Sequence, residues 1–267
     1  IRAGYDRRLA TGVICASGTM AQLIPPSTVL ILLGITLQNA NIQANLQMGV
    51  FGGSALSITD LFAAAFVPGI MLVALYASWI MLTAWRRPEA CPAIAVSEAE
   101  RRNLWRRALV AIVPPLALIV LVLGSIITGT ATATESSAVG ALGACVIAAL
   151  RGRFRRGLVL DVARSTFFIS TMIFAILIGA TVFALVFRGL GGDHVVARFV
   201  TNLPGGVNGA IFFVLAVIFF LGFLVDTFEI IFIVIPIFAP VLIVLGADPV
   251  LFGVLVAIVL QTSYLTP

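Results

Sequence analysis

Three residues with oxygen-bearing side chains lie close together in the stretch VDTFE: Asp226, Thr227 and Glu229. They separate two apolar runs, 210–224 and 230–245, which are short for bilayer spans. Ionisable groups at membrane depth face water, a cavity or a partner, and hard cations prefer oxygen ligands. We therefore expect Asp226 and Thr227 to bind a cation. An alternative stays open, in which Asp226 lies near the surface and caps the second half-helix, and Glu229 fits a helix cap equally well.

A second polar interruption is SGTMAQLIPPSTV, residues 17–29, inside an otherwise apolar run. Its proline pair removes two backbone donors and should break the helix. The first half-helix would end in free carbonyls and the second would begin with free N–H groups, which bind ions and anionic groups in secondary transporters. A plain kink in a packed helix is the alternative. The polar residues beside the break are Ser17, Gly18, Thr19 and Gln22 on the carbonyl side, and Ser27 and Thr28 as caps of the second half.

The end of the sequence repeats this pattern. QTSYLTP, residues 261–267, follows an apolar run, and it shares the Leu-x-Pro order of AQLIPPS. Interrupted helices in corresponding halves of a chain point to a binding site. We therefore predict a second helix break at Pro267, with Thr262, Ser263 and Thr266 beside it.

Composition places these interruptions in a membrane. The chain is 61% hydrophobic and 10% charged, with a mean hydropathy of +1.17, whereas soluble domains carry about 25% charged residues. No repeated period-2 alternation occurs, so the expected fold class is an all-α integral membrane protein. The run 136–150 is rich in small residues, which suits close helix contact. The other expected apolar runs are 9–37 (broken), 60–85, 108–128, 165–187 and 250–265.

Arginines predict the topology. The chain has 16 arginines, no lysine and 11 acidic residues. Fourteen arginines fall in three clusters, at 2–8, 86–107 and 151–164, and the loops 38–59, 129–135 and 189–209 hold only Arg188 and Arg198. The positive-inside rule makes the clusters cytoplasmic, a reading we prefer to nucleic-acid binding. The alternation holds only if the runs around VDTFE form one re-entrant hairpin with Asp226 at its tip.

Several other kinds of site are excluded by composition. His194 is the single histidine, and Cys15, Cys91 and Cys145 lie far apart, so we expect no metal cage and no disulfide framework. No GxxxxGK[ST] motif occurs, so energy must come from an ion gradient or a partner. The segment SEAERRNLW predicts a cytoplasmic interfacial helix near 97–106.

Four stretches carry a resemblance to a known family: GYDRRLATGVICASGTMAQLIPPSTVLILLG, TGTATATESSAVGAL, GFLVDTFEIIFIVIPIFAPVL and GADPVLFGVLVAIVLQTSYLTP. They resemble the large membrane subunit (DctM-type permease) of TRAP, or tripartite ATP-independent periplasmic, transporters. The resemblance covers nearly all of the chain. Relative to the family, the N-terminal half with a first hairpin and the tail after Pro267 are absent, so we expect a fragment. VDTFEI with LQTSYLTP resembles the subgroup linked to 2-oxo acids and related carboxylates.

The resemblance implies an inverted-repeat, elevator-type symporter of the bacterial inner membrane, driven by Na⁺ and without a cofactor. It implies as partners a small TRAP membrane subunit, a periplasmic solute-binding protein and an organic anion such as a dicarboxylate or 2-oxo acid. The implied domains are the first discontinuous helix at 1–37, connecting and scaffold helices at 38–190, and the re-entrant hairpin with the second discontinuous helix at 191–267. The first and last would belong to a mobile transport domain.

Site residues are carried over position by position. One Na⁺ would bind near Gly18 and Thr19, and a second between the hairpin tip and the second break. The implied ion-binding residues are Ser17, Gly18, Thr19, Asp226, Thr227, Thr262 and Thr266. The implied substrate-binding residues are Ser27, Thr28 and Ser263, and the helix breaks are Pro25, Pro26 and Pro267. Glu135 is expected to cap a helix at the outer boundary of the scaffold rather than to bind substrate.

Two other functions stay open. Another ion-coupled anion transporter of similar inverted-hairpin architecture would work without a binding protein. An intramembrane aspartyl protease would need a second acid facing Asp226, and only Glu229 and Glu135 are available. We expect a transporter and no enzyme, with no catalytic residues.

Overall fold

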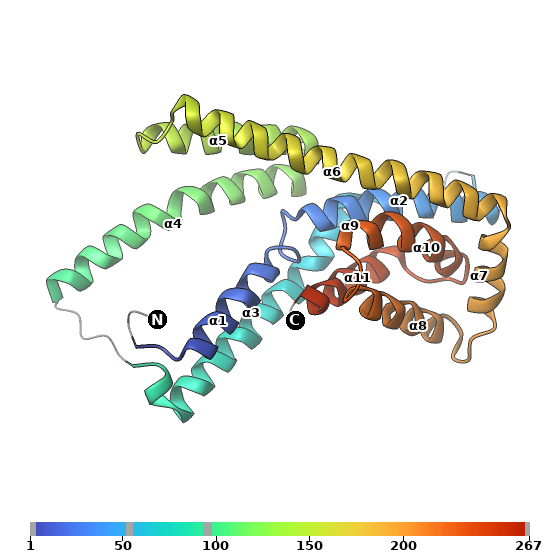
Figure 1. Ribbon diagram of the computed structural model, residues 1–267, viewed down its shortest axis with the longest axis horizontal. Helices are drawn as coiled ribbons and strands as arrows, with labels where there is room; N and C mark the ends of the chain where they lie inside the picture. Colours follow the sequence, from blue (N-terminus) through green and yellow to red (C-terminus); the bar gives the residue numbers. More distant parts are fainter. Residues whose placement is uncertain (1–3, 52–55, 93–97, 265–267) are drawn as a thin grey trace. The chain divides into compact units, whose positions relative to one another are not determined.

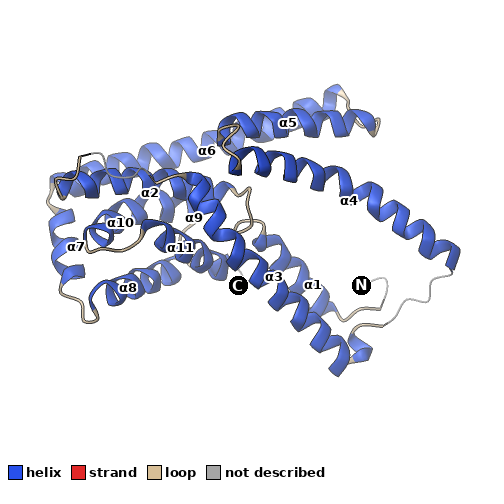
Figure 2. Ribbon diagram, turned by 180° about the vertical axis from the view of Figure 1, so that it is seen from behind, coloured by secondary structure: helices blue, strands red, loops and turns tan. Residues whose placement is uncertain are grey.

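The computed structural model describes residues 4–51, 56–92 and 98–264, and every regular element in this part of the chain is a helix (Figures 1 and 2). The elements are α1 (Arg7–Met20), α2 (Thr28–Gln47), α3 (Ile58–Arg86), η1 (Pro88–Ala90), α4 (Glu98–Ile127), α5 (Ala133–Leu150), α6 (Arg156–Gly189), α7 (Gly192–Thr201), α8 (Gly206–Leu221), α9 (Thr227–Glu229), η2 (Ile230–Val234), α10 (Ile235–Val244) and α11 (Pro249–Tyr264).

Six segments are long and apolar enough to cross a membrane, which confirms the predicted all-α membrane class. They are Thr28–Gln47, Ile58–Arg86, Asn103–Ile127, Ala133–Leu150, Arg156–Gly189 and Thr227–Val244. The apolar helices α8 and α11 are shorter. Helices α4, α5 and α6 bury little of their apolar surface against the described residues.

The first of two compact units contains α1, the second part of α3, α4, α5 and the start of α6. Helices α4 and α5 pack against each other, and the hydroxyls of Ser125 and Ser136 lie 2.8 Å apart between them. A Cβ atom at Gly143 would approach Leu118 to 2.3 Å, so this glycine allows the close contact. The expectation that 136–150 forms a closely packed helix is confirmed.

The segment near 97–106, which was predicted as a cytoplasmic interfacial helix, is helical over residues 98–106, and its place at the membrane interface stays a prediction. Residues 98–106 form the first turns of α4, which continues through Pro114 and Pro115 to Ile127. The polar start and the apolar span are therefore one helix. Nothing in the intervening sequence Arg107–Val113 favours a turn, since it lacks glycine and proline.

The second compact unit contains α2, the first part of α3, most of α6 and the helices α7 to α11. Its core lies where α2 packs against α10 and α11, and α11 packs in turn against α8. Fully buried side chains here include Leu33, Leu37, Ile235, Phe252 and Val256. The boundaries of the two units differ from those of the three domains predicted from the sequence, 1–37, 38–190 and 191–267. The assignment of these domains to transport and scaffold roles stays a prediction.

Two segments predicted as outer loops contain helix. Within 38–59, the polar stretch QNANIQANLQ continues α2 to Gln47, and within 189–209 the chain forms α7. Packing explains the first difference, because Ala40 and Ala44 are buried and draw the polar residues between them into the helix. Tertiary burial thus outweighs the weak helix propensity of asparagine.

A close helix contact in the second unit predicts a specific stability effect. Gly253 of α11 faces Leu37 and Leu61, and a Cβ atom there would lie 2.6 and 2.8 Å from their methyl carbons. We expect Gly253→Leu to lower the free energy of unfolding by about 1–3 kcal/mol, because the core is overpacked. The control is Gly179→Leu in α6, where a Cβ atom meets nothing within 4 Å. Thermal unfolding in detergent measures the stability of both variants. Equal melting temperatures would contradict the close contact of Gly253 with Leu37 and Leu61.

Candidate functional site

The first break lies where the proline pair predicts it. Helix α1 ends at Met20 and α2 begins at Thr28, with no regular helix over residues 21–27. Leu23, Pro25 and Ser27 are buried within the break. Residues 21–27 therefore form an ordered, packed interruption, and the plain kink is excluded.

Ser27 joins the two sides of this interruption. Its hydroxyl donates a hydrogen bond to the carbonyl of Gln22 and accepts one from the N–H of Leu30 at 3.2 Å. Ser27 is therefore the N-cap of α2, as predicted, and its side chain is 2% exposed. Thr28 is the first helical residue and its side chain is exposed. Substrate binding by Ser27 stays a prediction, and it would require this hydroxyl to give up a partner.

The predicted ion-binding residues of the first break lie in the last turns of α1, which belongs to the first unit. Ser17 and Thr19 turn their hydroxyls back to carbonyls of their own helix, at 3.1 and 3.0 Å. Gly18 has open space around its α-carbon. The last carbonyls of any helix lack a following N–H within the helix, so this end offers oxygen ligands from the backbone rather than from side chains.

The hairpin tip lies between α8 and α9, and the arms of the hairpin pack against each other. Asp226 occupies the N-cap position of α9, but its exposed carboxylate makes no capping hydrogen bond. Glu229 is half-buried and makes no capping bond either. Thr227 is buried, with 4% of its surface exposed. The tip therefore offers a buried hydroxyl beside a free carboxylate.

A π-helical turn follows the tip. In η2 the N–H of Ile235 donates to the carbonyl of Ile230, five residues earlier rather than four. Pro236 comes next and has no N–H to continue the ordinary pattern, which explains why the ladder shifts here. Such turns are frequent at functional sites.

The structure brings the hairpin tip to the end of α11. The hydroxyl of Thr227 is hydrogen bonded to that of Tyr264. One helical turn earlier lies Gln261, whose side chain is 3% exposed, and its amide nitrogen and oxygen both lack a partner among the described residues. A buried unpaired amide is destabilising by about 1–3 kcal/mol, so such a group is expected to serve a ligand or partner.

Gln261 and Tyr264 were not predicted as site residues. The signal was available, because both lie in the QTSYLTP motif, but only its hydroxyl residues beside Pro267 were selected. Thr262 donates to the carbonyl of Val259 at 2.6 Å and is exposed. The side chain of Ser263, together with Thr266 and the predicted break at Pro267, lies outside the described residues.

The side chains at the tip and at the end of α11 carry oxygen donors, which hard cations prefer. Within the described ranges, no group of three His, Cys, Asp or Glu side chains could hold a metal ion. An ion bound beside Thr227 would therefore meet mainly hydroxyl, amide and carbonyl oxygens, with the carboxylates of Asp226 and Glu229 as the acidic groups of the tip. Transition metals prefer nitrogen and sulfur ligands, whereas oxygen ligands suit hard cations.

Glu135 has the capping role expected of it. The N–H of Thr132 donates to the Glu135 carboxylate at 2.8 Å, and the N–H of Glu135 donates to the Thr132 hydroxyl at 3.3 Å. This is a complete capping box at the start of α5.

The sequence matches, over residues 1–267, the family described as tripartite ATP-independent periplasmic transporter, DctM component. The chain belongs to this family. Similar proteins include the ectoine/5-hydroxyectoine TRAP transporter large permease protein UehC of Ruegeria pomeroyi (29% identity, 100% of this chain, 58% of the relative) and the C4-dicarboxylate TRAP transporter large permease protein DctM of Rhodobacter capsulatus (28%, 100% and 59%). The DctM protein of Pseudomonas aeruginosa is 27% identical, over 100% of this chain and 58% of its own length.

The chain thus spans a little under three fifths of the length of these relatives. Membership of the DctM family and the six apolar helices confirm a multi-pass protein of the bacterial inner membrane. DctM components are parts of transporters, so the chain is not an enzyme and the intramembrane protease is excluded.

The two bonds of Ser27 predict a stability effect at the first break. We expect Ser27→Ala to lower the free energy of unfolding by about 1–2 kcal/mol, because it removes the cap of α2 and unpairs the Gln22 carbonyl. The matched control is Thr28→Ala, whose hydroxyl is exposed and takes no part in the cap. Equal melting temperatures for the two variants in detergent would contradict the joining role of Ser27.

The contact between Thr227 and Tyr264 predicts an effect on local opening. We expect Tyr264→Phe to speed backbone hydrogen exchange at residues 222–230, because the hydroxyl that ties the tip to α11 is lost. Hydrogen exchange followed by mass spectrometry measures this. Tyr76→Phe in α3 is the control. If it speeds exchange at residues 222–230 as much as Tyr264→Phe does, the bond between Thr227 and Tyr264 does not hold the tip.

Proposed function

We propose that this chain is part of a Na⁺-coupled symporter that takes up an organic anion across the inner membrane. The observation that carries the proposal is the cluster of Thr227, Tyr264 and the unpaired Gln261, where the hairpin tip meets the end of α11. Family membership supports the transport role, and relatives are named for C4-dicarboxylates and ectoines. By that analogy we propose a small carboxylate, such as a dicarboxylate or a 2-oxo acid.

We infer two ion sites. At the second, Asp226 and Thr227 from the tip and Thr262 and Thr266 from the following segment supply oxygens, and the amide oxygen of Gln261 adds a further ligand. At the first, the carbonyl end of α1 near Gly18 and Thr19 supplies backbone oxygens, together with Ser17. Moving one charge through 100 mV is worth about 2.3 kcal/mol, so two or more ions could drive strong accumulation of a monoanion.

The anion itself would be held by helix N-termini and hydroxyls. The N-terminus of α2 presents the exposed Thr28 beside the Ser27 cap, and a half-helix N-terminus favours negative charge. Ser263 would serve the corresponding place after the second apolar run. Bound cations close by would lower the electrostatic penalty of placing a carboxylate at this depth.

The transport cycle we propose is of the elevator type. The hairpin and the two interrupted helices would move substrate past a scaffold, which a small membrane subunit supports. A periplasmic solute-binding protein would deliver the anion. The long apolar faces of α4 and α6 that this chain leaves exposed are compatible with such a membrane partner.

Uptake by the complete three-part system in proteoliposomes tests the proposal. The anion is first identified by thermal-shift screening of carboxylates against the binding protein. We expect uptake to require an inward Na⁺ gradient and the binding protein. Uptake that persists unchanged without Na⁺ would overturn the ion coupling, and uptake without the binding protein would favour the anion transporter that works alone.

A substitution at the tip gives a residue-level test. We expect Asp226→Asn to raise the Na⁺ concentration for half-maximal uptake about tenfold, which corresponds to about 1.4 kcal/mol, because the site loses its charged ligand. Asp161→Asn in α6 is the control, since it removes the same charge from an exposed position outside the tip. An unchanged Na⁺ dependence for Asp226→Asn would remove this residue from the site.

A further inference from the structure

The second proline pair of the chain frees two carbonyls in α4. Pro114 and Pro115 lie inside this helix and have no N–H to donate to the carbonyls of Val110 and Ala111, four residues earlier. Both carbonyls would remain unpaired at the edge of an apolar span. Arg151 occupies them, since its Nη2 donates to the carbonyl of Val110 at 2.7 Å and to that of Ala111 at 3.3 Å.

A regular capping motif fixes the backbone around Arg151. Arg151 is the C-cap of α5, and Gly152 follows in the left-handed region with a φ of +63°. The N–H of Gly152 donates to the carbonyl of Ala149 and that of Arg153 to the carbonyl of Ala148, both at 2.9 Å. This Schellman motif closes the helix and fixes the backbone from which Arg151 and Arg153 project.

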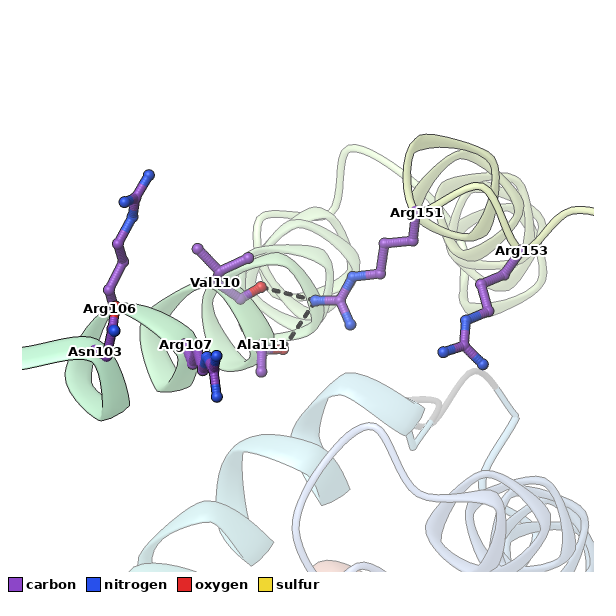
Figure 3. Close-up of a pocket in the computed structure, with 7 residues that line it drawn as sticks. All are labelled: Asn103, Arg106, Arg107, Val110, Ala111, Arg151 and Arg153. Carbon is purple, nitrogen blue, oxygen red and sulfur yellow. Dashed lines mark hydrogen bonds between the residues drawn. The ribbon is translucent and has the colours of Figure 1, made fainter. Parts of the chain in front are cut away.

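These arginines line a hollow of about 770 Å³ between α4 and the end of α5. Figure 3 shows Arg151 reaching across to α4, with Arg107 on the same stretch of α4 and Arg106 pointing the other way. Asn103 and Arg153 complete the polar lining, and among the side chains that the structure describes no acidic one lines the hollow. Only one nitrogen of Arg151 is engaged with the Val110 and Ala111 carbonyls, so the remaining guanidinium donors can serve a ligand.

The hollow lies beside the ends of two apolar spans, which is where lipid headgroups are expected. Asn103 begins the apolar span of α4, and Leu150 ends that of α5. The neighbouring side chains of Trp105, Val110 and Leu150 are exposed, with 65%, 63% and 84% of their surface uncovered. A tryptophan at this level is typical of the membrane interface. A ligand here would therefore have both a charged group and apolar chains beside it.

We propose that this hollow is a binding site for the phosphate of an anionic phospholipid. Arg107, Arg151 and Arg153 would donate charge-assisted hydrogen bonds to the phosphate oxygens, while the acyl chains lie along α4 and α5. The proline-freed carbonyls act as positioning groups, because they hold Arg151 before the lipid arrives. Arginine suits this role better than lysine, since its planar donor fork serves the carbonyls and the phosphate at once.

A general effect of positive charge is the competing explanation, because arginines cluster on the inner side of most membrane proteins. It does not account for the matched geometry, in which two prolines free the two carbonyls that one arginine fills. A free phosphate or nucleotide shares the ligand chemistry, but the exposed apolar helix surface beside the hollow favours a lipid. A general charge effect, a free phosphate and a bound phospholipid can be distinguished by which ligands bind and which arginines they need.

Native mass spectrometry of the whole permease subunit tests the site, with lipid binding as the readout rather than transport. The probes are dioleoylphosphatidylglycerol and dioleoylphosphatidylcholine, with inorganic phosphate as a competitor. We expect selective binding of the phosphatidylglycerol. Arg107→Gln combined with Arg153→Gln should lower its affinity about tenfold or more, because two of the three arginines proposed to bind the phosphate are lost. The charge-matched control is Arg155→Gln with Arg156→Gln, two exposed arginines outside the hollow.

A second variant leaves every charge in place. Pro114→Ala with Pro115→Ala restores N–H donors to α4, so the Val110 and Ala111 carbonyls rejoin the helix and release Arg151. We expect weaker binding of phosphatidylglycerol although the helix itself gains propensity. Equal losses in the two arginine pairs, displacement by inorganic phosphate, or equal binding of both lipids would overturn the site. Unchanged affinity in the proline variant would overturn the positioning role of the two carbonyls.

Discussion

Backbone polar groups in hydrocarbon must find partners inside the protein, and this constraint explains where the chemistry of the chain lies. Each proline in a span removes a donor and leaves a carbonyl without its usual partner. The chain resolves this in different ways. At Pro25-Pro26 the helix ends and a serine hydroxyl closes the gap, at Pro114-Pro115 an arginine fills two carbonyls, and before Pro236 the helix shifts to a π-turn.

The end of α11 is the place where the constraint is not satisfied within the described chain. Tyr264 and Thr227 satisfy each other, whereas the amide of the buried Gln261 has no partner among the described residues. Elsewhere, buried polar side chains such as Ser27 and Ser136 are hydrogen bonded. Buried polar groups in proteins are normally hydrogen bonded. We therefore expect an ion, a substrate or another part of the permease to supply the partner that the Gln261 amide lacks among the described residues.

Much of the fold could be predicted from the sequence, because composition, apolar runs and proline pairs act locally. The break before Ser27, the hairpin around VDTFE and the Glu135 cap all depend on short-range rules. The helical end of α2 and the helix α7 could not be predicted in this way, because packing decides them. The same holds for the partnership of Arg151 with Val110, which joins residues 41 positions apart, and for the contact of Tyr264 with Thr227.

The bond pattern of Ser27 limits which residues evolution can place at the first break. An isolated helix accepts aspartate as readily as serine at its first cap, since either oxygen can accept from the backbone. Here the same oxygen must also donate, because it faces the Gln22 carbonyl on the opposite side of the break. A carboxylate in that position would repel the Gln22 carbonyl, so a hydroxyl suits this cap and an aspartate does not.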